Sequence, residues 1–553
     1  MHLKSPHPPL DIPKTSILDF IYPPDASPPD FPLWIDAKDP SFFLTPKSAR
    51  QWICRLGQGL ERKGIKAGDV CLVFTPNHIF VPVAYLGIVS MGAIFSGLNP
   101  SYTVDEAAFQ ISNTGAKLML VHPTLVHTAI EAAKRTVLST DMLFLFGDQE
   151  SEPLNGIQDW RSMLSSPADA DLWKWKSLSP EQAVKQVATL NFSSGTTGLP
   201  KGVCISHHSL IANVCQLQIA YDLSKPKRWI DILPLYHAYG QCFYILIAAK
   251  YRIPVLIMKA FVFEEFLKTI ETQRITSLQV VPPIMIMLDK RPEVSKYDLS
   301  SVTEIVCGAA PLSRELQQAV ATKLGVRVTQ AYGATETTCG LMCSPWGLLE
   351  TPIGSVGLIV PNTEIKLLDD DGRDVAIGER GEIYARGPQI ALGYWRNEKS
   401  TLESFDSEGW YRTGDVGMVD KKGFFWILDR KKELIKVKGL QVSPAEVEAV
   451  LLENPDVADA GVVGIKIGNN EWPRAYVKLK DGAEGRVGKD QIFDWVKWKL
   501  SRHKWLIGGV VFVDEVPRLA SGKLARKTLR QWAERDAKTI EATDGVATPT
   551  SKL

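Results

Sequence analysis

The sequence of 553 residues has almost no net charge. It holds 63 lysines and arginines against 62 aspartates and glutamates, which gives +1 at pH 7. Such a chain has no field that would attract nucleic acid or an anionic membrane, so we expect no nucleic-acid partner. The eight cysteines show no zinc-binding spacing and mostly lie in apolar runs. They predict reduced, buried thiols in an intracellular protein.

The sequence also lacks a secretory signal and a membrane-spanning run. Residues 1–29 are rich in proline and have no apolar core of the signal-peptide kind. The longest apolar stretch, residues 242–258, is interrupted by Lys250 and Arg252. A transmembrane helix needs about 20 apolar residues in succession, so we expect a soluble protein that is not integral to a membrane.

No Walker A loop is present, and no Gly-x-Gly-x-x-Gly follows a predicted strand. The nearest candidate is residues 193–203, where Lys201 is followed by Gly202 instead of serine or threonine. The segment lies between a β-prone run (187–192) and a run with helical spacing (209–223). It combines glycines, hydroxyl side chains and one lysine: Ser193, Ser194, Gly195, Thr196, Thr197, Gly198 and Lys201. This composition suits a phosphate clamp, although an ordinary surface loop has similar residues.

Short apolar runs alternate with helix-like runs over residues 47–262 and predict α/β layers with largely parallel sheets. Residues 354–426 change to short strands with Gly and Asp turns, which predicts a β-rich subdomain. A small α+β domain follows. We therefore expect an α/β protein of two or more domains, in which the small α+β domain (about residues 432–537) is followed by a flexible tail (541–553).

Further motifs follow the glycine-rich segment in a fixed order. They are Pro234 to Gly240 (PLYHAYG), Gly308 to Pro311 (GAAP), Gln330 to Thr337 (QAYGATET), Trp410 to Asp415 (WYRTGD), Asp429 to Lys436 (DRKKELIK) and Pro517 to Arg526, which contains Ser521-Gly522-Lys523. Together they resemble the motifs of the adenylate-forming superfamily, which includes acyl-CoA synthetases, 4-coumarate:CoA ligases, luciferases and peptide-synthetase adenylation domains. The resemblance covers about residues 47–530, and the 4-coumarate:CoA ligase-like branch matches best.

The resemblance implies an ATP- and Mg²⁺-dependent acid–CoA ligase, in which an acyl-adenylate forms first and coenzyme A then displaces AMP. It assigns nucleotide binding to the glycine-rich segment and to Gly308, Ala309, Ala310, Gln330, Ala331, Tyr332, Gly333, Thr335, Asp415 and Arg430. It assigns Mg²⁺ to Glu336 and Thr196, since the metal prefers oxygen ligands. Without this resemblance, Tyr332 would more often be a packing residue and Asp415 an ordinary turn carboxylate.

The resemblance gives the two half-reactions separate lysines. Lys523 approaches the carboxylate and the α-phosphate in the first, and Lys436 takes part in the second beside the CoA-binding pair Lys438 and Gly439. The resemblance also implies a large N-terminal domain (1–429), a hinge (430–432) and a small mobile C-terminal domain (433–540). Lys432 would be the hinge residue, where backbone rotation turns the C-terminal domain. The chain departs from the family at Lys431 and Leu440, which are often apolar and aromatic.

The resemblance places the acyl pocket around His237 and Tyr239, and it counts His237 among the catalytic residues. Without the resemblance, a histidine beside aromatic residues would more often be a core residue. Small, uncharged residues complete the pocket and leave room for an aromatic or medium-chain acid: Cys307, Gly308, Ala309, Gly333, Ala334, Thr338 and Cys339. These residues do not show whether the substrate is an aryl-propenoic, an arylacetic or a medium-chain fatty acid.

Three other functions stay open at this point. A luciferase-like oxygenase shares the chain length and the C-terminal Ser551-Lys552-Leu553, and a stand-alone adenylation enzyme shares the motifs. A degenerate, non-enzymatic adenylate sensor would be expected to lack Lys523 or Glu336, and both are present. The terminal Ser-Lys-Leu follows a polar tail and predicts recognition by the peroxisomal import receptor and a peroxisomal location.

Overall fold

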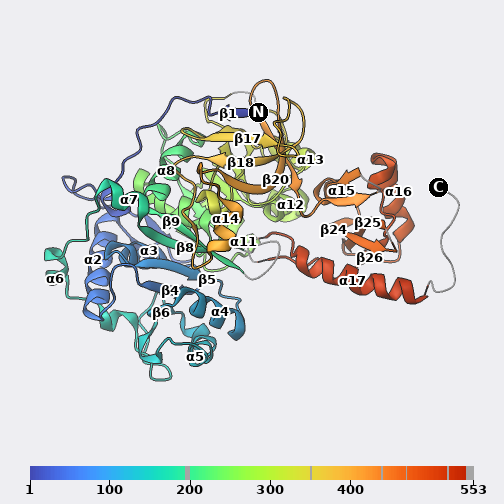
Figure 1. The fold of residues 1–553 in the computed structure, drawn as a ribbon. Coiled ribbons are helices and arrows are strands. Elements are labelled where there is room, and N and C mark those ends of the chain that lie inside the picture. Colours follow the sequence, from blue (N-terminus) through green and yellow to red (C-terminus); the bar gives the residue numbers. More distant parts are fainter. Residues whose placement is uncertain (194–199, 349–350, 438–439, 469, 520–521, 544–553) are drawn as a thin grey trace.

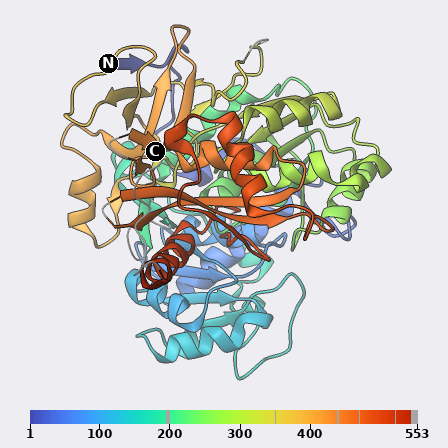
Figure 2. The same cartoon turned by 90° about the vertical axis from the view of Figure 1, so that its right-hand side faces the viewer.

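The computed structural model describes residues 1–193, 200–348, 351–437, 440–468, 470–519 and 522–543, without the side chains of 541–543. The chain forms a large N-terminal domain and a smaller C-terminal domain beside it (Figure 1). Figure 2 looks from the side of the C-terminal domain and shows its two long helices, α16 (Lys489–Lys499) and α17 (Arg526–Thr543), in front of the larger domain.

Two seven-stranded sheets form the centre of the N-terminal domain. The first has the order β19-β9-β8-β5-β4-β6-β7 and the second the order β14-β13-β12-β10-β11-β2-β3. The first comprises β4 (Val70–Phe74), β5 (Ile94–Leu98), β6 (Leu118–Val121), β7 (Leu143–Leu145), β8 (Val187–Ser193), β9 (Lys201–Ser206) and β19 (Gly393–Tyr394). The second comprises β2 (Trp34–Asp36), β3 (Phe43–Leu44), β10 (Trp229–Asp231), β11 (Val255–Ile257), β12 (Ser277–Val280), β13 (Glu304–Cys307) and β14 (Arg327–Gln330).

Most neighbouring strands of these sheets are parallel, and helices cover them. Parallel strands are buried on both faces, so β4 and β5 are buried along their whole length. Side chains cap the connecting helices: Thr103 and Glu106 form a capping box at the start of α4 (Val104–Thr114). The helix ends at Gly115, whose φ of 65° is left-handed, a conformation that glycine adopts without strain.

A five-stranded antiparallel sheet forms the β-rich part of the N-terminal domain, at the top of Figure 1. Its order is β1 (His2–Lys4), β17 (Glu364–Leu368), β18 (Gly381–Arg386), β20 (Tyr411–Val419) and β21 (Phe425–Arg430). The edge strand β1 was not predicted from the proline-rich N-terminus. It forms because residues 2–4 pair with residues 364–366, which are distant in sequence.

The C-terminal domain has its own sheet and hydrophobic core. The sheet contains β24 (Val457–Ile467), β25 (Asn470–Leu479) and β26 (Val510–Phe512), with the ribbon β22 (Ile435–Val437) and β23 (Leu440–Val442) beside them. The helix α15 (Pro444–Leu452) and the helix α17 both contact β24. Ser443 caps α15 and accepts a hydrogen bond from the Glu446 N–H, as its Ser-Pro start suggests.

The predicted α/β class is confirmed, with one local difference beside the glycine-rich segment. Residues 201–206 form the strand β9, antiparallel to β8, before α8 (His207–Leu217) begins. We expected the next element to be a helix because apolar residues from 209 onward have helical spacing. Residues 201–206 are a strand because they form hydrogen bonds with β8. The glycine-rich segment therefore connects the two strands of a hairpin.

The eight cysteines are free thiols, seven of them buried and Cys339 partly exposed. Within the residues described, no helix is both long enough and apolar enough to cross a bilayer.

Candidate active site

The candidate site lies where several strands of the second sheet end. The expected site residues follow these strands: Gly308 comes directly after β13, Ala331 directly after β14, and His237 six residues after the end of β10. In open α/β sheets, ligands bind at the carboxyl ends of the strands. The fold thus brings three motifs that are far apart in sequence to one edge of one sheet.

The glycine-rich segment is described only at its two ends. Ser193 ends β8 and Lys201 begins β9, while Ser194, Gly195, Thr196, Thr197 and Gly198 lie outside the described residues. The Lys201 ammonium lies 4.9 Å from the centre of the Tyr394 ring. Tyr394 belongs to β19, which pairs with β9, so this cation–π contact follows from the sheet pairing.

Asp415 is a buried carboxylate held by two neighbours. The Tyr332 hydroxyl donates to it over 2.5 Å, and the Arg430 guanidinium lies 3.2 Å away. Asp415 and Arg430 face one another across β20 and β21. Burial raises the pKa of Asp415, and the charge of Arg430 opposes that rise. The carboxylate can still accept hydrogen bonds, as a ligand of a sugar diol must.

Glu336 is a second buried carboxylate, with 7% of its surface exposed. It lies in a single 3₁₀ turn, residues 335–337, and accepts a hydrogen bond of 2.8 Å from the Tyr394 hydroxyl. Among the described residues, no group of three or more His, Cys, Asp or Glu side chains could hold a metal ion.

Lys523 enters this site from the C-terminal domain. Burial, and next the charge of Arg430, lower the pKa of Lys523 to about 8, while the carboxylates of Asp415, Glu336 and Glu433 oppose that shift. The loop lies at the strand ends of the second sheet, because a Cβ built on Gly522, directly before Lys523, would lie 3.2 Å from a Val281 methyl and 3.5 Å from a Pro283 ring carbon, just after β12.

Two ion-pair groups hold the loop that carries Lys523. Arg518 pairs with Asp459 over 2.7 Å and donates to the Gly522 carbonyl over 2.8 Å. After the loop, Arg526 lies 2.7 Å from both Glu433 and Glu448. Glu433 follows the predicted hinge residue Lys432, so Arg526 joins the lysine loop to the segment where the C-terminal domain begins.

His237 is neutral in this arrangement. Burial, and next the charge of Lys523, lower its pKa to about 3. Its Nδ1 atom accepts the Tyr239 backbone N–H over 3.4 Å. An imidazole that stays neutral can line a pocket for an uncharged group without the cost of burying a charge.

Small residues and one tyrosine form the predicted acyl-pocket wall. Tyr239 donates its hydroxyl to the Val306 carbonyl over 3.3 Å, which leaves its ring beside Gly308. A Cβ atom on Gly333 would lie 1.7 Å from the Cys339 carbonyl oxygen, so only glycine fits there. Ala331 lies near Gly308, with its oxygen 3.6 Å from a Cβ built on that glycine.

Two non-glycine residues of this wall have left-handed backbones. Ala309 has φ of 71° and Thr338 has φ of 65°. The Thr338 hydroxyl donates to the Gln389 carbonyl over 2.7 Å, and the Cys339 N–H donates to the Thr337 carbonyl over 2.7 Å. A β-branched residue with positive φ costs about 1–3 kcal/mol, and such strain collects at ligand sites.

The structure does not bring some of the predicted site residues to Asp415 and Glu336. The Gln330 amide donates to the Gln317 side chain (2.9 Å) and the Leu312 carbonyl, so it holds α13 (Arg314–Leu324). Lys436 is exposed on β22, and Lys432 is exposed in a turn. Lys438 and Gly439 lie outside the described residues.

The departure from the family at Lys431 has a structural reason. Its ammonium lies 2.7 Å from Asp370 and 3.0 Å from Glu382, both in the β-rich part of the N-terminal domain. An apolar residue at this position could not form these ion pairs. They attach the start of the predicted hinge segment to the large domain.

Tyr394 is a site residue that the sequence did not reveal. It contacts both Glu336 and Lys201, and burial raises the pKa of its hydroxyl, which Glu336 raises further. In the sequence it is one tyrosine among 14, between a glycine and a tryptophan. Only the pairing of β19 with β9 brings it to the site, so no local signal could have identified it.

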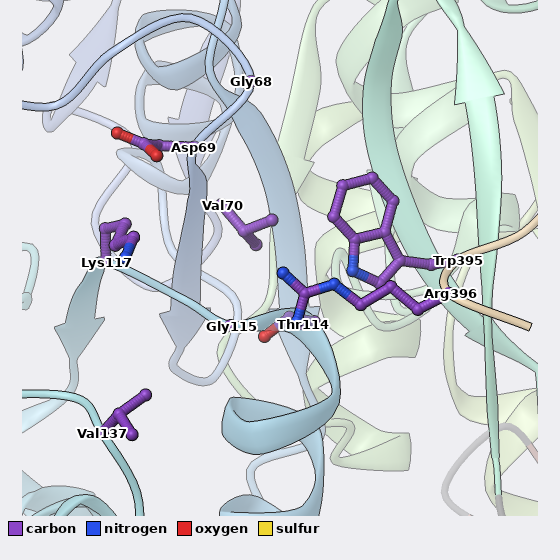
Figure 3. A pocket seen from close by; sticks show the side chains of 9 residues that line it. All are labelled: Gly68, Asp69, Val70, Thr114, Gly115, Lys117, Val137, Trp395 and Arg396. Carbon is purple, nitrogen blue, oxygen red and sulfur yellow. The ribbon is translucent and has the colours of Figure 1, made fainter.

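The pocket in Figure 3, of about 250 Å³, is not part of this site. It lies where β4 begins and α4 ends, lined by Asp69, Lys117 and Trp395 among others. The guanidinium of Arg396 lies against Gly115, within 2.9 Å of a Cβ built there. A cation at the C-terminal end of a helix is favourable, so Arg396 has a structural role in this pocket.

Comparison with known proteins assigns the chain to a class of AMP-binding enzymes. The family model "AMP-binding enzyme" matches residues 26–395, and the model "AMP-binding enzyme C-terminal domain" matches residues 446–523. The chain belongs to the AMP-binding enzyme family.

The relatives and solved structures extend over nearly the whole chain. "Acyl-CoA synthetase ACTT5" of Alternaria alternata is 37% identical over 91% of this chain and 88% of that protein. "Probable 4-coumarate--CoA ligase 2" of Dictyostelium discoideum is 35% identical over 96% of this chain and 97% of that protein. The crystal structure of the anthranilate CoA ligase AuaEII has the same fold, with a TM-score of 0.84 at 24% identity, over 95% of this chain and 98% of that one.

Proposed function

We propose that this enzyme is an ATP-dependent acid–CoA ligase that activates an apolar carboxylic acid as its acyl-adenylate and then forms acyl-CoA. The observation that carries the proposal is the position of the lysine loop: Gly522, directly before Lys523, packs against Val281 and Pro283, which follow β12 of the second sheet. The charges of Asp415 and Glu336 act on the Lys523 ammonium there. The names of the acyl-CoA synthetase and 4-coumarate–CoA ligase relatives support the same chemistry.

The first half-reaction joins two anions. The acid's carboxylate oxygen attacks the α-phosphorus of ATP, the bond from that phosphorus to the bridging oxygen breaks, and pyrophosphate leaves. Cations must offset the repulsion and stabilise the charge of the transition state. Lys523 can approach both reacting groups, while the glycine-rich segment would bind the β- and γ-phosphates. Asp415 would accept hydrogen bonds from the ribose hydroxyls, with Arg430 beside it.

The remaining nucleotide contacts follow the strand ends. We infer that the adenine lies against the ring of Tyr332 and the backbone of residues 308–310, with Thr335 donating its hydroxyl to a phosphate. The Gln330 side chain is hydrogen-bonded to Gln317 on α13. We therefore propose that Gln330 positions this wall and does not itself contact the nucleotide.

The residues also fit a Mg²⁺ ion. Glu336 offers a buried carboxylate oxygen, and its bond to Tyr394 fixes the direction of that oxygen. Mg²⁺ usually combines one or two carboxylates with phosphate oxygens, so the ion would arrive with ATP. The ion supplies positive charge beside the phosphates. Thr196, the second predicted ligand, lies outside the described residues.

The second half-reaction needs a different face of the C-terminal domain. The thiol of coenzyme A attacks the acyl carbon, the acyl–oxygen bond breaks, and AMP leaves. With Lys523 in the site, Lys436 stays exposed. We propose that the domain from residue 433 turns about Lys432, so that Lys436, Lys438 and Gly439 then reach the acyl-adenylate.

We propose that the acid is apolar apart from its carboxylate. The expected wall around Tyr239 and Gly308 has no charged residue, and the one histidine, His237, is neutral. The hydroxyl of Tyr239 already donates to the Val306 carbonyl. Aryl and medium-chain acids both satisfy these conditions.

The experiment that tests this function incubates the protein with ATP, Mg²⁺, coenzyme A and a panel of aryl and medium-chain acids, and identifies the products by mass. We expect AMP, pyrophosphate and one or more acyl-CoA thioesters. Formation of ADP, or no thioester from any acid, would refute the proposal.

We further infer that the import receptor for peroxisomes binds Ser551-Lys552-Leu553, which would place the enzyme in that organelle. The support is the sequence of the tail, since these residues lie outside the described part of the chain.

The Tyr394→Phe variant tests how Glu336 is held. Phenylalanine keeps the ring beside Lys201 but removes the hydroxyl that donates to the carboxylate. A hydrogen bond to a charged group contributes about 1.5–3 kcal/mol, so we expect roughly tenfold slower adenylation and a higher Mg²⁺ concentration for half-maximal rate. Steady-state rates over a Mg²⁺ series measure both. Unchanged Mg²⁺ dependence would show that the hydroxyl does not position Glu336.

The pH dependence of adenylation should report the charge of Lys523. Because the pKa of Lys523 is lowered to about 8, it loses its ammonium charge as the pH rises through that value in the free enzyme. We expect kcat/KM for adenylation to fall above about pH 8, since this parameter follows groups of the free enzyme. The thioester step from supplied acyl-adenylate should lack this fall. The same fall in both steps would assign it to another group.

A further inference from the structure

One lysine of the large domain is bound to the small domain at a distance from the active site. Lys290 is the last residue of α12 (Pro282–Lys290) and is partly buried. Its ammonium donates to the Leu452 carbonyl over 2.8 Å and lies 3.4 Å from the Val457 carbonyl. Both acceptors belong to the C-terminal domain.

The chemistry of this contact is favourable. Leu452 is the last residue of α15, and the final carbonyls of a helix have no partner within the helix. They also carry the negative end of the helix dipole, so an ammonium there is stabilising. Burial, and next the charge of Lys480, lower the pKa of Lys290. A half-buried ammonium needs such acceptors, because leaving it without partners would cost free energy.

The same helix α12 touches the C-terminal domain at its other end. A Cβ atom built on Gly522 would lie 3.2 Å from a Val281 methyl and 3.5 Å from a Pro283 ring carbon. Gly522 directly precedes Lys523. Nine residues of helix span about 13 Å, so α12 contacts the small domain at two separated points. Contacts at two separated points restrict rotation of the C-terminal domain far more than a single contact would.

We propose that Lys290 is a positioning residue for the first half-reaction: it holds the C-terminal domain in the orientation in which Lys523 reaches the active site. The inference rests on the proposed two-step function. Turning the domain to present Lys436 must separate Leu452 from Lys290, because α12 stays with the large domain. The contact therefore stabilises the adenylating orientation and not the thioester-forming one.

A neighbouring lysine provides a matched control. Lys323, on α13, also donates its ammonium to a backbone carbonyl, that of Asp289, and this acceptor directly precedes Lys290. Both partners of that bond lie in the large domain. The Lys323→Met variant therefore removes a lysine–carbonyl bond from the same place without touching the small domain.

The test measures the two half-reactions separately for Lys290→Met, Lys290→Arg and Lys323→Met. A charge-assisted hydrogen bond changes an equilibrium constant by roughly tenfold to a hundredfold. We expect Lys290→Met to slow acyl-adenylate formation by that factor while the thioester step from supplied acyl-adenylate stays the same or becomes faster. Lys290→Arg keeps the donor and should restore most of the adenylation rate. Lys323→Met should change neither step.

Other outcomes separate the possible failures. If Lys290→Met leaves adenylation unchanged, the contact does not position Lys523. If both half-reactions fall by the same factor, with a lower melting temperature, Lys290 is merely structural. If the unaltered enzyme forms neither acyl-adenylate nor thioester, the proposed function itself is wrong. A readout independent of activity is hydrogen exchange in the last turn of α15, which should become faster in Lys290→Met and not in Lys323→Met.

Discussion

The Lys523→Ala variant is expected to form acyl-adenylate about 10²–10³-fold more slowly than the unaltered enzyme, because removal of one preorganised charge from a site of this kind costs that much. The thioester step should change far less. The loop that carries Lys523 packs against Val281 and Pro283 at the strand ends, where the charges of Asp415 and Glu336 act on the ammonium, as the first step requires. Stopped-flow or quenched assays with ATP and acid, and separately with synthetic acyl-adenylate and coenzyme A, measure the two steps.

The control for this variant is Lys527→Ala. Lys527 is an exposed lysine of α17, four residues after Lys523, and it should tolerate the change without loss of either step. An equal loss of both steps in Lys523→Ala would contradict the use of two faces of the C-terminal domain.

The Lys436→Ala variant should have the opposite effect. We expect adenylation at nearly the normal rate and a thioester step slowed by about 10²-fold, since the lost charge acts only after the domain has turned. Lys436 is exposed on β22, so we expect that the first step does not need it. A burst of acyl-adenylate that stays bound to the enzyme, detected by mass after denaturation, is the expected observation.

Lys421→Ala is the matched control, because Lys421 is exposed in a turn of the antiparallel sheet and lies in the domain that does not move. Gly439→Trp should reproduce the defect of Lys436→Ala, since a large side chain would obstruct the pantetheine arm of coenzyme A. Slow adenylation in Lys436→Ala would instead place this lysine in the first step.

Local sequence signals predicted much of the fold. The apolar run at residues 70–74, in the region of alternating runs, forms β4, and α15 begins at the cap Ser443 with Pro444 as its first residue. These elements follow from residues that are close in sequence: apolar runs for buried strands, and a cap with proline at the first helical position. The family was also identified from ordered motifs, and the family models confirm it.

Pairing between distant segments was not predictable in the same way. The strand β9 and the edge strand β1 exist because of their hydrogen-bonded partners, and neither has a strong pattern of its own. Tyr394 and Lys290 are similar cases. Each has a role only through a contact made by the fold, with Glu336 in one case and the end of α15 in the other.

The same distinction between local signals and distant contacts applies to the candidate site. The types of residue needed to activate a carboxylate were visible in the motifs, and the structure brings Asp415, Glu336 and Lys523 together. Their individual roles stay predictions. The left-handed backbone of Thr338 was not visible, because a threonine gives no sign of positive φ. Its conformation depends on the Gln389 carbonyl, 51 residues away.

In the proposed mechanism, the acid's own oxygen attacks the α-phosphate of ATP. An acid whose carboxylate carries heavy oxygen (¹⁸O), converted by the enzyme with ATP and coenzyme A, tests this step. When the thiol displaces AMP, the oxygen that bridged carbon and phosphorus stays with the phosphate. We expect one ¹⁸O atom in the AMP and one in the thioester carbonyl. AMP without the label, or label in pyrophosphate or inorganic phosphate, would refute the mechanism.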